Sequence, residues 1–112
     1  MDPNWENLHS NTGRVVADLM KLFPDCRDAY RSITTVHPGD YVPPHTDTRS
    51  PDWITRIHVP IITNPGAVFI VNDVEHQLEV GMAYQVNIGA PHAIRNDGHS
   101  SRIHLMFDVC HD

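Results

Sequence analysis

The stretch VHPGDYVPPHTDTRSPDWITRIHVPII, residues 36–62, decides the fold expected for this chain. In its second part, residues 54–61, one set of alternating positions is mostly apolar and the other set carries Arg56 and His58. This period of two indicates a β-strand with one buried face. The prolines at 43–44 cannot donate to a β-ladder, so the segment before this strand is expected at a sheet edge or at the mouth of a barrel.

The rest of the chain continues the strand pattern with short, turn-rich links. About eight strands of this kind predict an all-β antiparallel sandwich or barrel, and a jelly roll has this strand number. Asn72-Asp73 predicts a two-residue hairpin turn. Before the strands, apolar residues at helical spacing predict one helix, from Asn11 or Thr12 to about Leu22, that braces the outside of a sheet. The expected strands cover residues 32–36, 41–42, 54–62, 67–71, 74–80, 82–88, 92–95 and 101–109.

Length and charge narrow the function classes. A chain of 112 residues is expected to form a single domain, residues 1–112, with a lead-in and helix in residues 1–30 and the β-core in residues 31–109. The formal net charge of −6 argues against non-specific nucleic-acid binding. No apolar run suits a membrane span, the N-terminus is acidic and polar, and the two cysteines stand near opposite ends. We therefore expect a cytoplasmic protein with reduced thiols and no membrane partner.

Three residues are candidate metal ligands. His45 and Asp47 form a His-x-Asp pair on an extended segment, where residues two apart point the same way, and His92 follows much later in the chain. Two imidazoles and one carboxylate form the facial triad that binds non-haem Fe(II) and leaves further positions open. We expect His45, Asp47 and His92 to hold iron, with no catalytic residue beyond this metal centre.

Two expected strands carry basic side chains on one face. In residues 102–107, Arg102 and His104 lie opposite an apolar face, as Arg56 and His58 do in the earlier strand. A single strand of this kind would be expected to turn its polar face to solvent. Because two such strands accompany the candidate metal ligands, we expect both polar faces to line a cavity.

The basic residues suggest an anionic cosubstrate. Arg102 would bind the distal carboxylate of 2-oxoglutarate in the bidentate manner that lysine cannot provide. The hydroxyl of Thr34 would add a hydrogen bond, and Arg56 and His58 would hold the C1 carboxylate or an anionic substrate. The alternative for each arginine is a surface ion pair, for example with Asp108.

Several short motifs occur in order along the chain: Thr34–Gly39, His45–Asp47, Arg56–Pro60, Gly81–Tyr84, Pro91-His92 with Asn96, and Arg102–Leu105 with Asp108. Together they resemble the aspartyl/asparaginyl β-hydroxylase family over about residues 30–109. The resemblance implies a double-stranded β-helix, which is a cupin-like jelly roll. It also implies hydroxylation of an amino-acid or peptidyl substrate by Fe(II), O2 and 2-oxoglutarate, which is decarboxylated to succinate.

Carried over from the family, the iron ligands fall on His45, Asp47 and His92. Some animal members have glycine where Asp47 stands, so the chain resembles the full-triad bacterial type, which also resembles free-proline hydroxylases. The distal carboxylate of the cosubstrate falls on Arg102 and Thr34. The pair at positions 56 and 58 falls near the metal-proximal end of the cosubstrate.

The chain is near the minimal core for such an enzyme, so something further must shape the substrate site. The loop at residues 48–53 would serve as a lid, with Arg49 and Trp53 touching substrate, and His104 would line the cavity. A homodimer, in which a second subunit supplies walls of the site, is an alternative.

Two other functions remain open. A cupin-type metalloenzyme would use the same barrel without 2-oxoglutarate, although Arg102 speaks against it. A non-catalytic metal- or anion-binding module is the other. The partner is expected to be a small molecule or a peptide, and the sequence does not distinguish a peptidyl Asp or Asn from a free amino acid or another metabolite.

Overall fold

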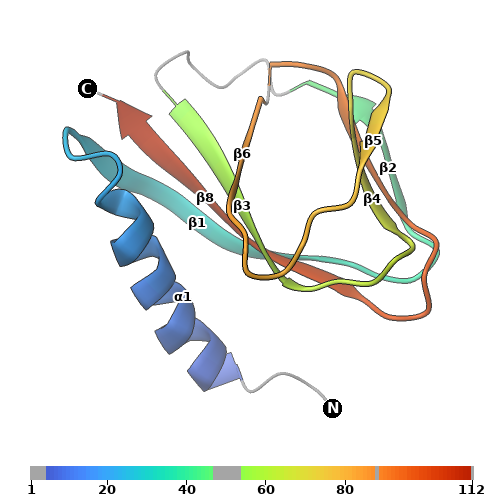
Figure 1. Ribbon diagram of the computed structural model, residues 1–112, viewed down its shortest axis with the longest axis horizontal. Coiled ribbons are helices and arrows are strands. Elements are labelled where there is room, and N and C mark those ends of the chain that lie inside the picture. Colours follow the sequence, from blue (N-terminus) through green and yellow to red (C-terminus); the bar gives the residue numbers. More distant parts are fainter. Residues whose placement is uncertain (1–4, 47–53, 88, 112) are drawn as a thin grey trace.

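The computed structural model describes residues 5–46, 54–87 and 89–111. Within them the chain forms one helix followed by strands alone, which confirms the mainly β fold class (Figure 1). The elements are α1 (Trp5–Met20), β1 (Cys26–Val36), β2 (Tyr41–His45), β3 (Ile54–Ile62), β4 (Ala67–Val71), β5 (Val74–His76), β6 (Tyr84–Val86), β7 (His92–Asn96) and β8 (Arg102–His111).

The strands form two four-stranded antiparallel sheets, with the orders β1-β8-β3-β6 and β2-β7-β4-β5. Successive strands alternate between the two sheets along much of the chain, which is the connectivity of a jelly roll. Figure 1 shows the two sheets on either side of a shared interior, with the chain crossing from β5 in one sheet to β6 in the other. The predicted jelly roll is therefore confirmed.

Strand β2 ends one sheet and pairs only with β7 among the described strands. This edge position is the one that the prolines at 43–44 predict, because an edge strand does not need every N–H. The pairing with β7 shifts register between Val42 and His45, across the two prolines. Regular pairing resumes at His45, the first candidate metal ligand.

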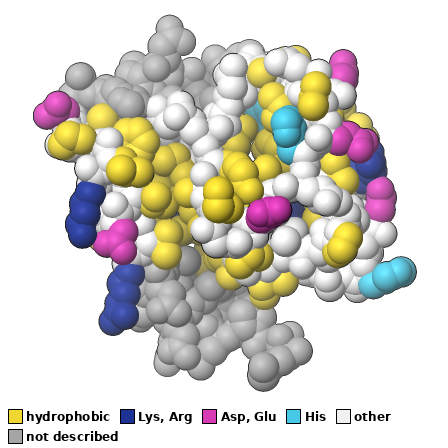
Figure 2. All heavy atoms as spheres, in the orientation of Figure 1, with side chains coloured by type: hydrophobic (Ala, Val, Ile, Leu, Met, Phe, Trp, Pro, Cys, Tyr) yellow, Lys and Arg dark blue, Asp and Glu magenta, His cyan; other side chains and the backbone are white. Residues whose placement is uncertain are grey.

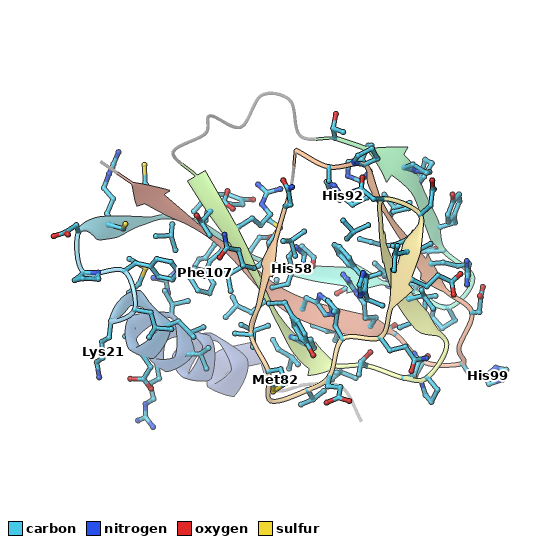
Figure 3. The ribbon with its side chains drawn as sticks, turned by 45° about the horizontal axis from the view of Figure 1, so that its top comes forward. Lys21, His58, Met82, His92, His99 and Phe107 are labelled. Carbon is cyan, nitrogen blue, oxygen red and sulfur yellow. The ribbon has the colours of Figure 1, made fainter. Side chains whose placement is uncertain are left out.

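Helix α1 lies on the outside of the β1-β8-β3-β6 sheet, beside β1 (Figure 1). Its Val16 packs in a cluster with Ile57 from β3 and with Leu105, Phe107 and Val109 from β8. Figure 3 shows Phe107 on the helix side of β8. This cluster is the main hydrophobic core that the structure describes, and the expected brace is confirmed.

Several predicted boundaries are wrong. The helix begins at Trp5 instead of Asn11 or Thr12, because residues that cap well are also tolerated inside a helix. Strand β1 begins at Cys26, within the expected lead-in, and pairs with the end of β8 as far as His111. Strands β5 and β6 are only three residues each, because residues 77–83 cross between the sheets. The hairpin turn at Asn72-Asp73 is confirmed by φ angles of 49° and 64°.

Strand β8 separates two environments. Its odd-numbered residues from Ile103 to Val109 face the helix side, and its even-numbered residues from Arg102 to Asp108 face the interior between the sheets. Both faces are buried over most of this length. A polar face buried in this way must be satisfied by partners or by a ligand.

Candidate functional site

His45 on β2 and His92 on β7 face each other directly across the two antiparallel strands. Their ring centroids are 4.3 Å apart, with 55° between the ring planes. His92 is buried and His45 is exposed, so the pair lies at the border between the interior and solvent. Figure 3 shows His92 at the end of the barrel where β2 lies.

Backbone carbonyls fix the orientation of both rings. His45 Nδ1 lies 2.8 Å from the Pro43 carbonyl oxygen, and His92 Nδ1 lies 2.9 Å from the Ala90 carbonyl oxygen. A carbonyl oxygen only accepts, so each Nδ1 carries the hydrogen and donates it. In the neutral form of each ring, Nε2 then carries the lone pair. This is the arrangement in which histidine binds a metal, with the second nitrogen anchored to the backbone.

Asp47, the third predicted ligand, lies outside the described residues, as do Arg49 and Trp53 of the expected lid. In the described part of the chain, no group of three His, Cys, Asp or Glu side chains is placed to hold a metal ion. The structure therefore supplies two imidazoles of the predicted centre. The contribution of the carboxylate stays a prediction.

A cavity of about 310 Å³ opens beside the two imidazoles, and we name it the basic cavity. It brings together the described candidate residues other than His104, from the five strands β1, β2, β3, β7 and β8. Besides apolar residues, its lining includes His45, His92, Thr34, Arg56, His58 and Arg102. Sequence periodicity predicted that Arg56, His58 and Arg102 share inward faces, and the closed jelly roll brings them together with His45, His92 and Thr34.

Arg102 is the dominant charge of the basic cavity. Its side chain is 3% exposed, and burial lowers its pKa to about 10. Its Nη2 donates to Thr34 Oγ1 at 3.3 Å and its Nη1 to His104 Nδ1 at 3.1 Å, whereas its Nε is buried with no hydrogen-bond partner. Among the described residues no carboxylate forms an ion pair with it. A buried cation with an unsatisfied N–H is costly, which favours an anionic ligand here.

Arg56 has a different environment. Its Nε and Nη2 donate to the two oxygens of Asp108 at 2.8 and 3.0 Å, because Arg56 on β3 lies opposite Asp108 on β8. The sequence left open an ion pair of this kind at the surface, and the structure places it in a partly buried position. The carboxylate neutralises much of the charge of Arg56. Arg102 is therefore the stronger binding partner for an anion in this cavity.

His58 and His104 form a neutral pair next to Arg102. Burial, followed by the positive charge of Arg102, lowers the pKa of His58 to about 3 and that of His104 to about 2. Arg102 only donates, so His104 Nδ1 accepts its hydrogen bond. His58 Nδ1, which is 3.1 Å from the same atom, must then carry a hydrogen and donate it. His58 is left with an unprotonated Nε2.

This tautomer bears on the role predicted for His58. An unprotonated Nε2 accepts hydrogen bonds and cannot donate one to a carboxylate. His58 lines the basic cavity, and Figure 3 shows it between the ribbons of the two sheets. His104 is fully buried and is not part of the lining of the basic cavity. It hydrogen-bonds with Arg102 and His58, which do line the cavity, and so helps to fix their positions.

Phe69 on β4 was not identified from the sequence. Its ring stacks on His92, with centroids 6.2 Å apart and 6° between the planes, and meets His58 edge-on at 5.3 Å. It is buried and forms part of the wall of the basic cavity. The only available signal was the inward position of residue 69 in the strand at 67–71, which does not distinguish a site wall from ordinary core.

These features define a jelly-roll protein with a basic cavity beside two imidazoles that are oriented by backbone carbonyls in the manner of metal ligands. The model of the family described as aspartyl/asparaginyl β-hydroxylase matches residues 3–112, and the chain belongs to this family. A search of curated proteins found no match. Within the described residues, no helix has the length and apolar character needed to cross a membrane.

Two solved structures share the fold. One is a predicted oxalate decarboxylase from Thermotoga maritima, which matches with a TM-score of 0.57 and 18% identity over 80% of this chain and 71% of that one. The other is the protein TT1209 from Thermus thermophilus, with a TM-score of 0.53 and 20% identity over 80% of this chain and 87% of that one. At this level of identity the likeness concerns the fold alone.

Proposed function

We propose that this protein is an Fe(II)- and 2-oxoglutarate-dependent oxygenase that hydroxylates an amino-acid or peptidyl substrate. The observation that carries the proposal is the buried guanidinium of Arg102, whose Nε has no hydrogen-bond partner, in the same cavity as His45 and His92. Membership of the aspartyl/asparaginyl β-hydroxylase family supports the hydroxylase chemistry.

The donor set suits iron. His45 and His92 each offer an Nε2 lone pair while Nδ1 is anchored to a backbone carbonyl, and Asp47 stands two residues after His45 in the sequence. Two imidazoles and a carboxylate form the ligand set of non-haem Fe(II) oxygenases. Bound there, iron would supply the oxidation of the substrate by O2, coupled to decarboxylation of 2-oxoglutarate to succinate.

The basic cavity suits a dicarboxylate. Arg102 has a free buried N–H and would bind the distal carboxylate, with the Thr34 hydroxyl beside it at 3.3 Å from Nη2. A carboxylate bound to Arg102 would gain charge-assisted hydrogen bonds away from water, where they are strongest. Arg56 stays paired with Asp108 and would contribute to the field of the cavity more than to direct binding.

The remaining walls hold the reactants in place. Phe69 packs against both His92 and His58, so it fixes these rings and keeps water from the space between them. The unprotonated Nε2 of His58 would accept a hydrogen bond from an N–H or O–H of a bound molecule. The partner in this proposal is a small molecule or a peptide. We also propose a homodimer in which a second subunit completes the substrate site.

The test is production of succinate by purified protein supplied with Fe(II), 2-oxoglutarate and O2, with and without a panel of free amino acids and short peptides. We expect succinate to form and to increase with at least one member of the panel. Iron binding without 2-oxoglutarate turnover across the panel would instead indicate a non-catalytic metal-binding module. Metal-dependent turnover of a substrate that needs no 2-oxoglutarate would indicate a cupin-type enzyme.

A further inference from the structure

A second cavity of about 310 Å³ lies next to the basic cavity, and we name it the apolar cavity. Its lining is mainly hydrophobic and aromatic: Phe69, Val71, Leu78, Tyr84 and Val86. None of the described residues that line it is Lys, Arg, Asp or Glu. It has the size and lining of a small-molecule site.

Three structural relationships join the two cavities. Phe69 belongs to the walls of both. Val71 lies opposite His92 in the β4–β7 pair, and Tyr84 lies opposite His58 in the β3–β6 pair. Side chains that face each other across neighbouring strands lie on the same side of a sheet and about 5 Å apart at Cβ. Residues that line the apolar cavity are therefore direct neighbours of His92 and His58, which line the basic cavity.

The apolar cavity lies between two edge strands, one from each sheet. Strand β5 is last in the order β2-β7-β4-β5, and β6 is last in the order β1-β8-β3-β6. In Figure 2 hydrophobic side chains gather across the middle of the face over which Figure 1 places β6. Polar residues of the lining (His76, Gln85 and Asn87) are exposed, so the cavity has an apolar interior and a polar mouth.

The two cavities differ in the charge that they accept. The basic cavity contains Arg102, which favours a carboxylate, whereas a carboxylate in the apolar cavity would lose water without gaining a cation. The hydroxyl of Tyr84 already accepts a hydrogen bond of 2.9 Å from the backbone N–H of Glu79. What the apolar cavity offers a ligand is chiefly hydrophobic surface.

We propose that the apolar cavity binds the uncharged, apolar side chain of the substrate, delivered either as a free amino acid or within a peptide. Its role in turnover rests on the proposed function, since the substrate's reacting carbon would lie by the imidazoles while its side chain passes Phe69. The binding itself requires neither iron nor 2-oxoglutarate. Phe69 is then a specificity-determining wall between cosubstrate and substrate side chain.

The experiment is a titration of metal-free protein followed by methyl NMR, with L-leucine, N-acetyl-L-leucine amide, L-alanine and L-aspartate as probes. We expect the leucine probes to shift the methyl signals of Val71, Leu78 and Val86 and to leave Val109, under the helix, unchanged. Leucine buries three more carbon atoms than alanine, so it is expected to bind on the order of tenfold or more tighter. L-Aspartate is expected to leave these methyl signals in place. The free and blocked probes distinguish the two sources of the side chain.

Variants add a matched comparison. Leu78→Asp places a carboxylate in the wall of the apolar cavity, whereas Val80→Asp makes the same change two residues away at a side chain that is 56% exposed. We expect Leu78→Asp to abolish the methyl shifts and Val80→Asp to preserve them. If Leu78→Asp fails to fold, the titration of the unaltered protein still decides the question.

Some results would overturn the proposal. These are leucine probes that leave the three methyl signals unmoved, equal binding of aspartate and leucine, or equal effects of the two aspartate variants. Such results would leave the proposed oxygenase function intact, because succinate formation is measured separately. Leucine binding without any succinate formation would have the opposite meaning, since the apolar cavity would stand and the oxygenase function would fall.

Discussion

His45 and His92 stand directly opposite each other at the open end of a β2–β7 pair, and both present an Nε2 lone pair because a backbone carbonyl accepts from each Nδ1. The two residues are 47 positions apart in the sequence, and only strand pairing brings them together. This geometry is the basis of the first prediction below.

Replacing either imidazole should remove iron binding. Mutation of a group that merely hydrogen-bonds to a metal ligand lowers metal affinity about 10- to 100-fold. Because His45→Ala and His92→Ala each remove a ligand itself, we expect each to lower the affinity for Fe(II) by more than about 100-fold. Titration with anaerobic Fe(II) measures the effect. His99→Ala, at an exposed turn position, is the matched control and should bind iron normally. Unchanged affinity in both cavity variants would remove them from the ligand set.

Arg102→Ala should weaken 2-oxoglutarate binding and leave the metal in place. Loss of one partner of a buried charged pair removes about 2 kcal/mol or more, so the dissociation constant of 2-oxoglutarate should rise about 30-fold or more. Calorimetry on the metal-loaded protein measures it. Arg95→Ala is the matched control, because Arg95 lies on β7 and pairs with Glu75 and Asp97 at the surface. A loss of metal with unchanged cosubstrate affinity would mean that Arg102 has another role.

Stability should fall as the pH is lowered from about 6.5 to 5. Burial lowers the pKa of His58 to about 3 and that of His104 to about 2, so below pH 6.5 the unfolded chain takes up protons that the folded protein does not bind. At about 1.4 kcal/mol per pH unit, each imidazole removes about 2 kcal/mol of stability at pH 5. Urea unfolding of metal-free protein at several pH values measures the slope.

A variant pair tests the origin of this pH dependence. His58→Asn should reduce the slope by about half, whereas His99→Asn should leave it unchanged because His99 is exposed. A wild-type profile that is flat between pH 7 and 5 would contradict the assignment of two buried neutral imidazoles.

The tautomers of the buried pair can be observed directly. Nitrogen-15 NMR of the histidine rings should show the hydrogen of His58 on Nδ1 and that of His104 on Nε2, since Arg102 and His58 both donate to His104 Nδ1. In Arg102→Ala the donor that fixes His104 is gone, and we expect the two tautomers to mix. A hydrogen on Nδ1 of His104 in the unaltered protein would exclude this arrangement.

Much of the fold followed from local patterns. The period of two at residues 54–61 and 102–107 put Arg56, His58 and Arg102 on inward faces, and the prolines at 43–44 marked an edge strand. The boundaries of the strands were predicted less well. Strand β1, for example, extends back to Cys26 because it pairs there with the end of β8. Such extension depends on a partner strand that local sequence does not reveal.

The sequence by itself determined which residues share a face of each strand, because side-chain direction in a strand alternates with position along that strand. Tertiary structure alone decided their partners. The register of β3 against β8 places Asp108 opposite Arg56 and leaves Arg102 with an unsatisfied N–H, so one arginine is neutralised and the other is ready for an anion. The closing of the two sheets likewise created the apolar cavity around Phe69 from residues of β4, β5 and β6 and the segment between the last two.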